Sequence, residues 1–217
     1  MKYRLGGLIL EDIIRENIVK VAKHMYEKGL VNPFEGNVSV LDGEQVYITP
    51  GGIYKGCLEK DMIVITDLNG NVLEGLYRPS SEIKMHLAAY RQRSDIKAVI
   101  HAHSPYATAY AVANKPIETK AYTEMISFFD KIPLAKYGTP STDQISEGIK
   151  EYIDSYDIIL LANHGIVAVG PDLFNALFKL EAAESMAKTL LLSKMLGGEK
   201  ELPEDELKIL HEMKNKA

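Results

Sequence analysis

The chain of 217 residues carries a formal net charge of −5, with 46% hydrophobic and 25% charged residues. This composition predicts one globular domain over residues 1–217, large enough to bury a sizeable core. The acidic balance argues against a nucleic-acid partner, and no apolar run approaches the ~20 residues of a membrane span. Because Cys57 is the only cysteine and no signal-peptide pattern is visible, we expect a cytoplasmic protein.

The first part of the chain shows one helical pattern followed by two hairpin patterns. Apolar residues recur at helical spacing over Ile9–Lys28, which predicts an amphipathic helix. Two β-hairpins are predicted next, because each pair of short strands flanks a turn dipeptide, Asp-Gly or Asn-Gly. The first hairpin pairs Phe34–Val40 with Gln45–Thr49, and the second pairs Met62–Thr66 with Asn71–Glu74.

The middle of the chain alternates helix and strand. A helix is predicted over Glu82–Gln92, and the apolar run Ala98–Ile100 indicates a short buried strand. A second helix is predicted over Pro105–Val112, since proline suits the first helical turn. Residues 114–140 have a weaker pattern, in which Lys131–Ala135 is interpreted as a short strand.

The last part of the chain predicts two helices around a pair of strands, before a short polar helix closes the chain. Ser141–Gln144 resembles a capping box that opens a helix ending near Ile153. Two apolar strands follow, Ile158–Ala162 and Ile166–Val169, and then a long helix over Leu173–Leu196. Alternating helices and hairpins predict an α/β fold with a mixed sheet covered by helices.

Three histidines lie at strand ends. His101 and His103 follow the strand Ala98–Ile100 at spacing i, i+2, so both side chains face the same side of the sheet. His164 lies between the last two strands, just before a glycine. A single histidine in such a place is more often a hydrogen-bonding residue than a ligand. Together the three predict a zinc site with an open coordination position.

Three short loops carry glycine or small polar residues suited to binding an anion. Serines at a helix start are well placed, because free N–H groups and the helix dipole attract phosphate there. Each loop alone is equally explained by turn chemistry or helix capping. No nucleotide-binding fingerprint accompanies them. The candidate phosphate-binding residues are Gly36, Asn37, Gly51, Gly52, Ser80 and Ser81.

Glu82 directly follows these serines. A carboxylate in the first turn of a helix often only stabilises the helix. If Glu82 faces the three histidines, it becomes a candidate general base or a fourth metal ligand. His86 lies one turn later, and we expect it to pack behind Glu82 rather than to bind the metal.

Five short motifs occur in an order that resembles the class II sugar-phosphate aldolase and epimerase family. The resemblance covers residues 10–196 and implies an α/β/α sandwich around a largely antiparallel sheet. It also implies a homotetramer with active sites between subunits. The motifs are Gly36–Ser39, Ile48–Gly52, Pro79–Glu82, His101–Ser104 and Asn163–Gly165.

The resemblance also implies roles for single residues. One Zn²⁺ per subunit would be bound by His101, His103 and His164, with Glu82 as catalytic acid/base and occasional fourth ligand. The three glycine and serine loops would hold the phosphate of a sugar phosphate. Tyr122 would reach into a neighbouring subunit's site as a proton donor. Zinc would act as a Lewis acid in reversible cleavage of a ketose 1-phosphate to dihydroxyacetone phosphate and an aldehyde such as lactaldehyde.

Two departures from the family pattern bear on the substrate. No tyrosine follows Tyr156, whereas aldolases of fuculose phosphate carry one in the C-terminal tail. The related 4-epimerases usually carry aspartate at the position of Glu82, which favours an aldolase here.

Alternatives remain open on the same scaffold: a methylthioribulose-1-phosphate dehydratase, an aldolase for 5-deoxypentulose phosphates, or a pentulose-phosphate 4-epimerase. A metal-free lysine aldolase, a structural zinc site and a non-catalytic adducin-like interaction domain are weaker alternatives.

Overall fold

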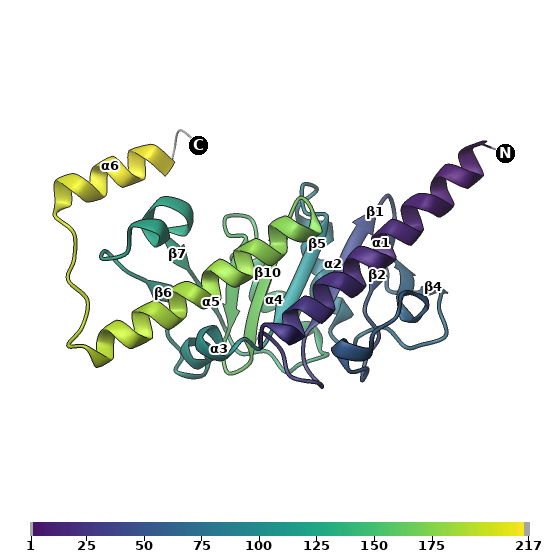
Figure 1. The fold of residues 1–217 in the computed structure, drawn as a ribbon, viewed down its shortest axis with the longest axis horizontal. Coiled ribbons are helices and arrows are strands. Elements are labelled where there is room, and N and C mark those ends of the chain that lie inside the picture. The colour runs from purple at the N-terminus through teal and green to yellow at the C-terminus, as the bar shows by residue number, and fades with distance from the viewer. Residues whose placement is uncertain (1, 215–217) are drawn as a thin grey trace.

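The computed structural model describes residues 2–214, with side chains from residue 9 to residue 213. Its centre is an eight-stranded sheet in the order β4-β3-β2-β1-β5-β10-β9-β8 (Figure 1). All neighbours in this sheet are antiparallel except β8 and β9. Its strands are β1 (Asn37–Asp42), β2 (Gln45–Ile48), β3 (Val64–Asp67), β4 (Val72–Glu74), β5 (Ala98–Ala102), β8 (Leu134–Ala135), β9 (Ile158–Leu161) and β10 (Gly165–Gly170).

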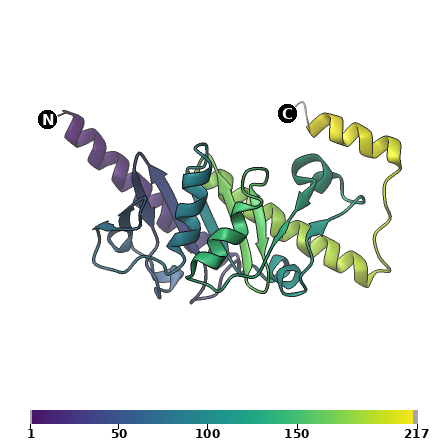
Figure 2. The ribbon, with the colours of Figure 1, turned by 180° about the vertical axis from the view of Figure 1, so that it is seen from behind.

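Helices cover both faces of the sheet. The long helices α1 and α5 cross one face (Figure 1), and α2 and α4 pack on the other (Figure 2). The predicted three-layer α/β/α sandwich with a mixed, largely antiparallel sheet is therefore confirmed. The helices are α1 (Lys2–Glu27), α2 (Ile83–Gln92), α3 (Pro105–Val112), α4 (Asp143–Lys150), α5 (Leu173–Met195) and α6 (Glu204–Lys214), with short helical turns η1 (Lys55–Cys57), η2 (Lys60–Met62) and η3 (Met125–Phe129).

The two faces of β5 contribute to two separate cores. Ala98 and Ile100 pack into the core under α1 and α5, whereas Val99 packs into the core under α2 and α4. Because strand side chains alternate between faces, His101 lies on the same face as Val99. The first predicted metal ligand therefore points toward the layer that contains α2.

The prediction of one strand over Lys131–Ala135 is wrong, because these residues form two short strands. Lys131–Ile132 is β7, which pairs with β6 (Ile117–Glu118) in a separate two-stranded sheet, and Leu134–Ala135 is β8 at the edge of the main sheet. Pro133 lies between them and has no N–H to donate, but its carbonyl accepts a hydrogen bond from Leu160 N at 2.8 Å. The proline divides the strand between two sheets.

Several predicted boundaries also shift, the first strand, for example, from Phe34–Val40 to Asn37–Asp42. The N-terminal helix begins at Lys2 rather than Ile9. The helix predicted from the Ser141–Gln144 capping box begins one residue later than that box implies. Its cap is Thr142, whose side chain accepts from Gln144 N, and the helix ends at Lys150 instead of near Ile153.

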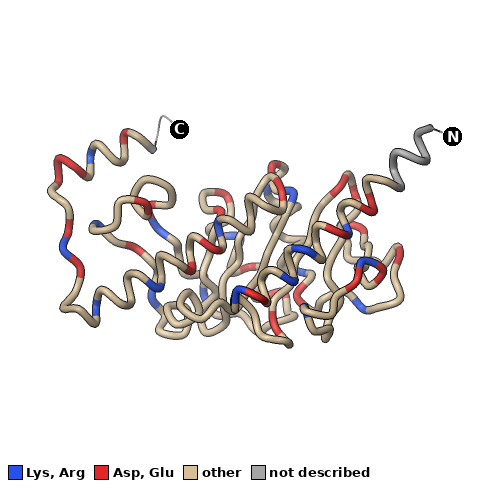
Figure 3. Tube along the Cα trace, viewed as in Figure 1, with Lys and Arg blue, Asp and Glu red and all other residues tan. Residues whose placement is uncertain are grey.

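Residues of both charge signs are interspersed along α1 and α5 (Figure 3). In the part of the chain that the structure describes, no helix combines the length and apolar character needed to cross a membrane.

Candidate metal and phosphate site

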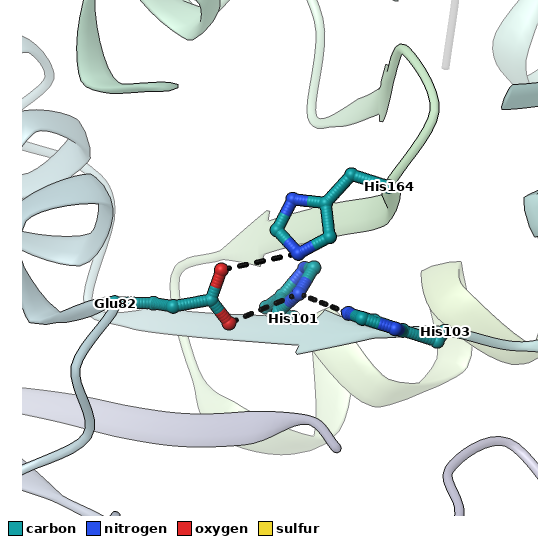
Figure 4. A group of neighbouring side chains, drawn as sticks. All are labelled: Glu82, His101, His103 and His164. Carbon is teal, nitrogen blue, oxygen red and sulfur yellow. Dashed lines mark hydrogen bonds and ion pairs between the residues drawn. The ribbon is translucent and has the colours of Figure 1, made fainter. Parts of the chain in front are cut away.

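The three histidines and Glu82 meet at one end of the central strands. His101 belongs to β5, His103 lies just beyond its end, and His164 occupies the turn between β9 and β10. Glu82 is the residue that precedes α2. Figure 4 shows the four side chains converging, and their potential ligand atoms all lie within 4.8 Å of one another. The predicted cluster therefore forms within a single chain.

The distances inside the cluster are short. The Nε2 atoms of His101 and His103 are 2.9 Å apart. Glu82 Oε2 lies 3.2 Å from His101 Nε2, and Glu82 Oε1 lies 3.2 Å from His164 Nε2. The three imidazole rings form an even triangle, with every pair of ring centroids 4.8 Å apart.

The hydrogen bonds of His101 determine which of its nitrogens faces the cluster. Its Nδ1 lies 3.0 Å from the backbone carbonyl of Ile166, and a carbonyl can only accept, so Nδ1 carries the hydrogen. The lone pair of Nε2 then points at His103 Nε2. Two imidazole lone pairs at 2.9 Å repel unless a proton or a cation lies between them. The donor set, three imidazole nitrogens and one carboxylate, fits a divalent metal.

Burial keeps this donor set in its ligand form. Desolvation is the main cause that lowers the pKa of His103 and of His164 to about 4, so both are neutral near pH 7. Burial alone would raise the pKa of Glu82, but the adjacent imidazoles of His101 and His164 and the hydrogen bond from Asn37 hold it below its usual value. The cluster thus offers one carboxylate beside the neutral imidazoles of His103 and His164.

A glycine allows the histidines to come this close. A Cβ atom on Gly165 would lie 2.5 Å from the carbonyl oxygen of Ala102 and 3.0 Å from His103 Cδ2. These distances are too short for any side chain, so the start of β10 can pack against the end of β5 only with glycine at this position. The His-Gly pair of the sequence therefore has a steric cause.

A small polar cavity of ≈ 110 Å³ lies beside the cluster and contacts Glu82 and His103. All six predicted phosphate-binding residues line it: Gly36, Asn37, Gly51, Gly52, Ser80 and Ser81. The structure therefore brings the three loops together next to the cluster of Glu82 and the histidines.

Two of these loops are held together by their own backbone. Gly51 N donates to the carbonyl of Arg78 and Ser80 N donates to the carbonyl of Thr49, both at 3.1 Å. The N–H groups of Gly51 and Ser80 are therefore occupied. Those of Gly52 and Ser81 have no acceptor within residues 2–214, so they are free to donate to an anion.

Sequence reasoning missed two charged residues of the cavity. Lys55 follows the second glycine loop and is only 4% exposed, and its ammonium donates to the Ile53 carbonyl at 3.0 Å. Burial lowers the pKa of Lys55. Glu35 also lines the cavity, and its Oε1 lies 3.4 Å from His103 Nδ1. The only sequence signal for either was its position beside a glycine loop.

Asn37 has a second role besides lining the cavity. Its Nδ2 donates to Glu82 Oε2 at 2.9 Å, and its Oδ1 lies in hydrogen-bond contact with His86 Nε2. The side-chain amide is therefore engaged with Glu82 in this conformation. His86 is fully buried and packs behind Glu82, as the sequence predicted, and desolvation lowers its pKa to about 3.

Tyr122 lies away from this cluster. It contacts the core under α5 and lines a different hollow with Phe128, Phe129 and Phe178. It does not line the cavity beside Glu82. Within one chain, the predicted proton donor and the predicted base are thus not brought together.

The fold and the site place the chain among proteins already known. Residues 16–191 match the family described as Class II Aldolase and Adducin N-terminal domain, so the chain belongs to this family. It is an aldolase of class II, a carbon–carbon lyase.

Individual relatives show what the chain is similar to. It is 37% identical to L-fuculose phosphate aldolase of Methanocaldococcus jannaschii over 82% of this chain and 96% of that protein. It is also 37% identical to 5-deoxy-D-ribulose 1-phosphate aldolase of Bacillus thuringiensis, over 90% of this chain and 92% of that protein. A solved structure of L-fuculose 1-phosphate aldolase superposes with a TM-score of 0.84 at 35% identity, covering 92% of this chain and 94% of that one.

Proposed function

We propose that this class II aldolase cleaves a ketose 1-phosphate of the L-fuculose 1-phosphate type, reversibly, to dihydroxyacetone phosphate and an aldehyde such as lactaldehyde. The observation that carries the proposal is the cavity of ≈ 110 Å³ that joins the predicted phosphate loops to Glu82 and His103. Two relatives with 37% identity are named as aldolases of sugar phosphates, one of them a sugar 1-phosphate, which supports this substrate class.

We propose zinc, one ion per subunit, as the metal held by His101, His103 and His164, with Glu82 as an occasional fourth ligand. Three nitrogens and one oxygen suit zinc better than a hard cation such as magnesium. When bound, the ion supplies Lewis-acid polarisation of the substrate's carbonyl and neighbouring hydroxyl oxygens.

Glu82 is the proposed base. Its carboxylate is ionised, and Oε1 is buried without a hydrogen-bond donor among the described residues, so this oxygen is free to accept a proton. In the direction of synthesis, Glu82 takes a proton from the hydroxymethyl carbon of dihydroxyacetone phosphate. The carbanion attacks the aldehyde carbon, and the aldehyde oxygen takes a proton from Tyr122. In cleavage the same protons move in reverse.

The phosphate is proposed to occupy the cavity formed by the glycine and serine loops. The free N–H groups of Gly52 and Ser81 would donate to it, and the ammonium of Lys55 would offset its charge. Gly51 and Ser80 hold the two loops in place through their backbone hydrogen bonds. Gly36 and Asn37 also line the cavity.

The oligomer is a separate part of the proposal. Because Tyr122 does not line the cavity beside Glu82 in its own chain, a proton-donor role requires Tyr122 from a neighbouring subunit. We therefore propose a homotetramer with active sites at subunit interfaces. We further propose that residues 1–217 form a single domain, and the packing of α6 on η3 supports this. We also propose that the protein is cytoplasmic.

A substrate panel tests the function. The metal-depleted protein, before and after addition of zinc, is assayed with the 1-phosphates of L-fuculose, L-rhamnulose, 5-deoxyribulose and methylthioribulose, and with L-ribulose 5-phosphate. We expect zinc-dependent release of dihydroxyacetone phosphate, fastest from L-fuculose 1-phosphate. Water loss or epimerisation without cleavage would replace the proposed reaction, and a preference for 5-deoxyribulose 1-phosphate would replace the proposed substrate.

Replacement of the base tests the mechanism. Glu82→Gln keeps the size of the side chain and removes its basicity, so we expect kcat to fall by about 10²- to 10⁴-fold. The three histidines remain, so zinc measured by atomic emission should stay near one per chain. A variant with normal turnover would show that Glu82 is not the base.

A further inference from the structure

A network of buried polar residues lies between α2 and β1, behind the carboxylate of Glu82. Glu82, which directly precedes α2, and His86 and Tyr90 on α2 are spaced four residues apart, so they lie along one side of the helix. On the strand, Asn37 and Ser39 are two residues apart and face that side. All five are nearly or completely buried, from 0% exposure for Ser39 and His86 to 8% for Glu82.

Each residue of this hydrogen-bonded network contacts the next. Tyr90 Oη lies 2.6 Å from Ser39 Oγ, and Ser39 Oγ lies 2.7 Å from His86 Nδ1. His86 Nε2 contacts Asn37 Oδ1, and Asn37 Nδ2 lies 2.9 Å from Glu82 Oε2. The contacts connect a buried phenol to the proposed catalytic carboxylate without a gap.

The chemistry of the end groups determines the direction of every hydrogen bond. An ionised carboxylate can only accept, so Asn37 must present its Nδ2 to Glu82 and its Oδ1 to His86. Asn37 Oδ1 also only accepts, so His86 carries its hydrogen on Nε2. The neutral ring then accepts at Nδ1 from the Ser39 hydroxyl. The Ser39 oxygen in turn accepts from the hydroxyl of Tyr90.

We propose that Tyr90, Ser39 and His86 are positioning residues, which act through Asn37 to hold the Glu82 carboxylate in a single orientation. Oε2 is kept in the hydrogen bond from Asn37, and Oε1 is left as the oxygen that exchanges a proton with substrate. The amide of Asn37 could otherwise rotate and present its oxygen to Glu82, which would repel the carboxylate. His86 prevents this rotation because only an acceptor fits against its Nε2–H.

The proposal rests on the role of Glu82 in the proposed function, and it makes a distinct kinetic prediction. His86→Leu removes the donor to Asn37 Oδ1 and leaves the amide free to rotate. We expect kcat to fall about tenfold or more, in the range seen for residues that orient catalytic groups, with KM and zinc content within about threefold of wild type. A merely structural role would instead lower the fraction of folded, zinc-loaded protein and leave kcat per zinc unchanged.

His86→Gln is the matched control. Glutamine can place an amide N–H close to the position of His86 Nε2 and so keep the donor to Asn37. We expect this variant to recover most of the kcat that His86→Leu loses. Wild-type kcat in His86→Leu, or equal losses in the leucine and glutamine variants, would overturn the proposal.

A spectroscopic measurement tests the hydrogen-bonded network without any substrate. In protein labelled with ¹⁵N-histidine and loaded with zinc, the resonances missing from the His86→Gln variant identify His86. We expect the neutral form with its hydrogen on Nε2 at pH 7. A hydrogen on Nδ1, or a doubly protonated ring, would overturn the proposal. This result is independent of whether any sugar phosphate in the panel is cleaved, so failure of the proposed function is recognised separately.

Discussion

At the scale of single residues, Lys55 carries a charge with no carboxylate partner among the residues that the structure describes. Its side chain is buried, and among the described residues its ammonium has only the carbonyl of Ile53 as an acceptor. Holding an unpaired ammonium in a buried position disfavours folding. An anion in the adjoining cavity would offset that cost, so the lysine matters more to the ligand than to the fold.

Lys55→Met should therefore separate binding from stability. We expect KM for the sugar phosphate, and the inhibition constant of inorganic phosphate, to rise about 10- to 100-fold, the loss of one hydrogen bond to a charged group. The midpoint of thermal unfolding should stay the same or rise, because an unpaired buried charge is removed. Steady-state kinetics and calorimetry give the two measurements.

Lys60→Met is the matched control, since Lys60 is half exposed and pairs with Asp12 outside the cavity. It should leave the KM unchanged. If Lys55→Met and Lys60→Met have the same KM, the ammonium of Lys55 takes no part in phosphate binding.

At the scale of secondary-structure elements, the site depends on the contact between the β9–β10 turn and the end of β5. Gly165 pairs with Leu161 across that turn, and the missing side chain lets its backbone approach Ala102 and His103. Any Cβ at this position must displace β10 from β5, which moves His164 away from the other two histidines.

Gly165→Ala should thus weaken both the fold and the metal site. We expect the free energy of unfolding of the metal-free protein to fall by about 1–3 kcal/mol, the usual cost of overpacking. Zinc affinity, measured by competition with a chromogenic chelator, should fall by about tenfold or more.

Gly43→Ala provides the comparison for that variant. Gly43 has a φ of +58° in the β1–β2 turn, and open space surrounds its Cα, so alanine there adds backbone strain but no clash. It should lower stability by about 1 kcal/mol with no change in zinc affinity. Equal zinc affinities in the two variants would show that the turn does not control the site.

The same elements show what the sequence could and could not predict. Strand alternation was enough to place His101 and His103 on one side, and the apolar runs around His164 located the third histidine. The division at Pro133 was missed because strand propensity does not report which sheet a strand joins. Lys55 was missed because its burial depends on tertiary packing, and no local pattern marks a buried lysine.

The hydrogen-bonded network that connects Tyr90 to Glu82 illustrates a further limit of prediction from sequence. The four-residue spacing of Glu82, His86 and Tyr90 is visible in the sequence and correctly suggested that His86 packs behind Glu82. The partners on β1 were not visible, since nothing in a single sequence pairs Ser39 with His86. Local periodicity predicts which side of an element a residue faces, but hydrogen-bond partners depend on the contacts between layers.

At the scale of the whole molecule, the separation of Tyr122 from Glu82 makes activity a property of the assembly. Each active site would combine the Glu82 of one subunit with the Tyr122 of another, as our proposal requires. In a closed ring of identical subunits, every such interface carries one complete site.

Mixed oligomers test this arrangement directly. Glu82→Gln and Tyr122→Phe chains, each impaired alone, are unfolded together, refolded at equal concentrations and assayed for release of dihydroxyacetone phosphate. Random assembly gives about a quarter of the interfaces an intact Glu82 and an intact Tyr122, so activity should recover to about a quarter of wild type. If both residues act within one chain, no mixed site contains the pair. The mixture would then show only the average of the two separate variants.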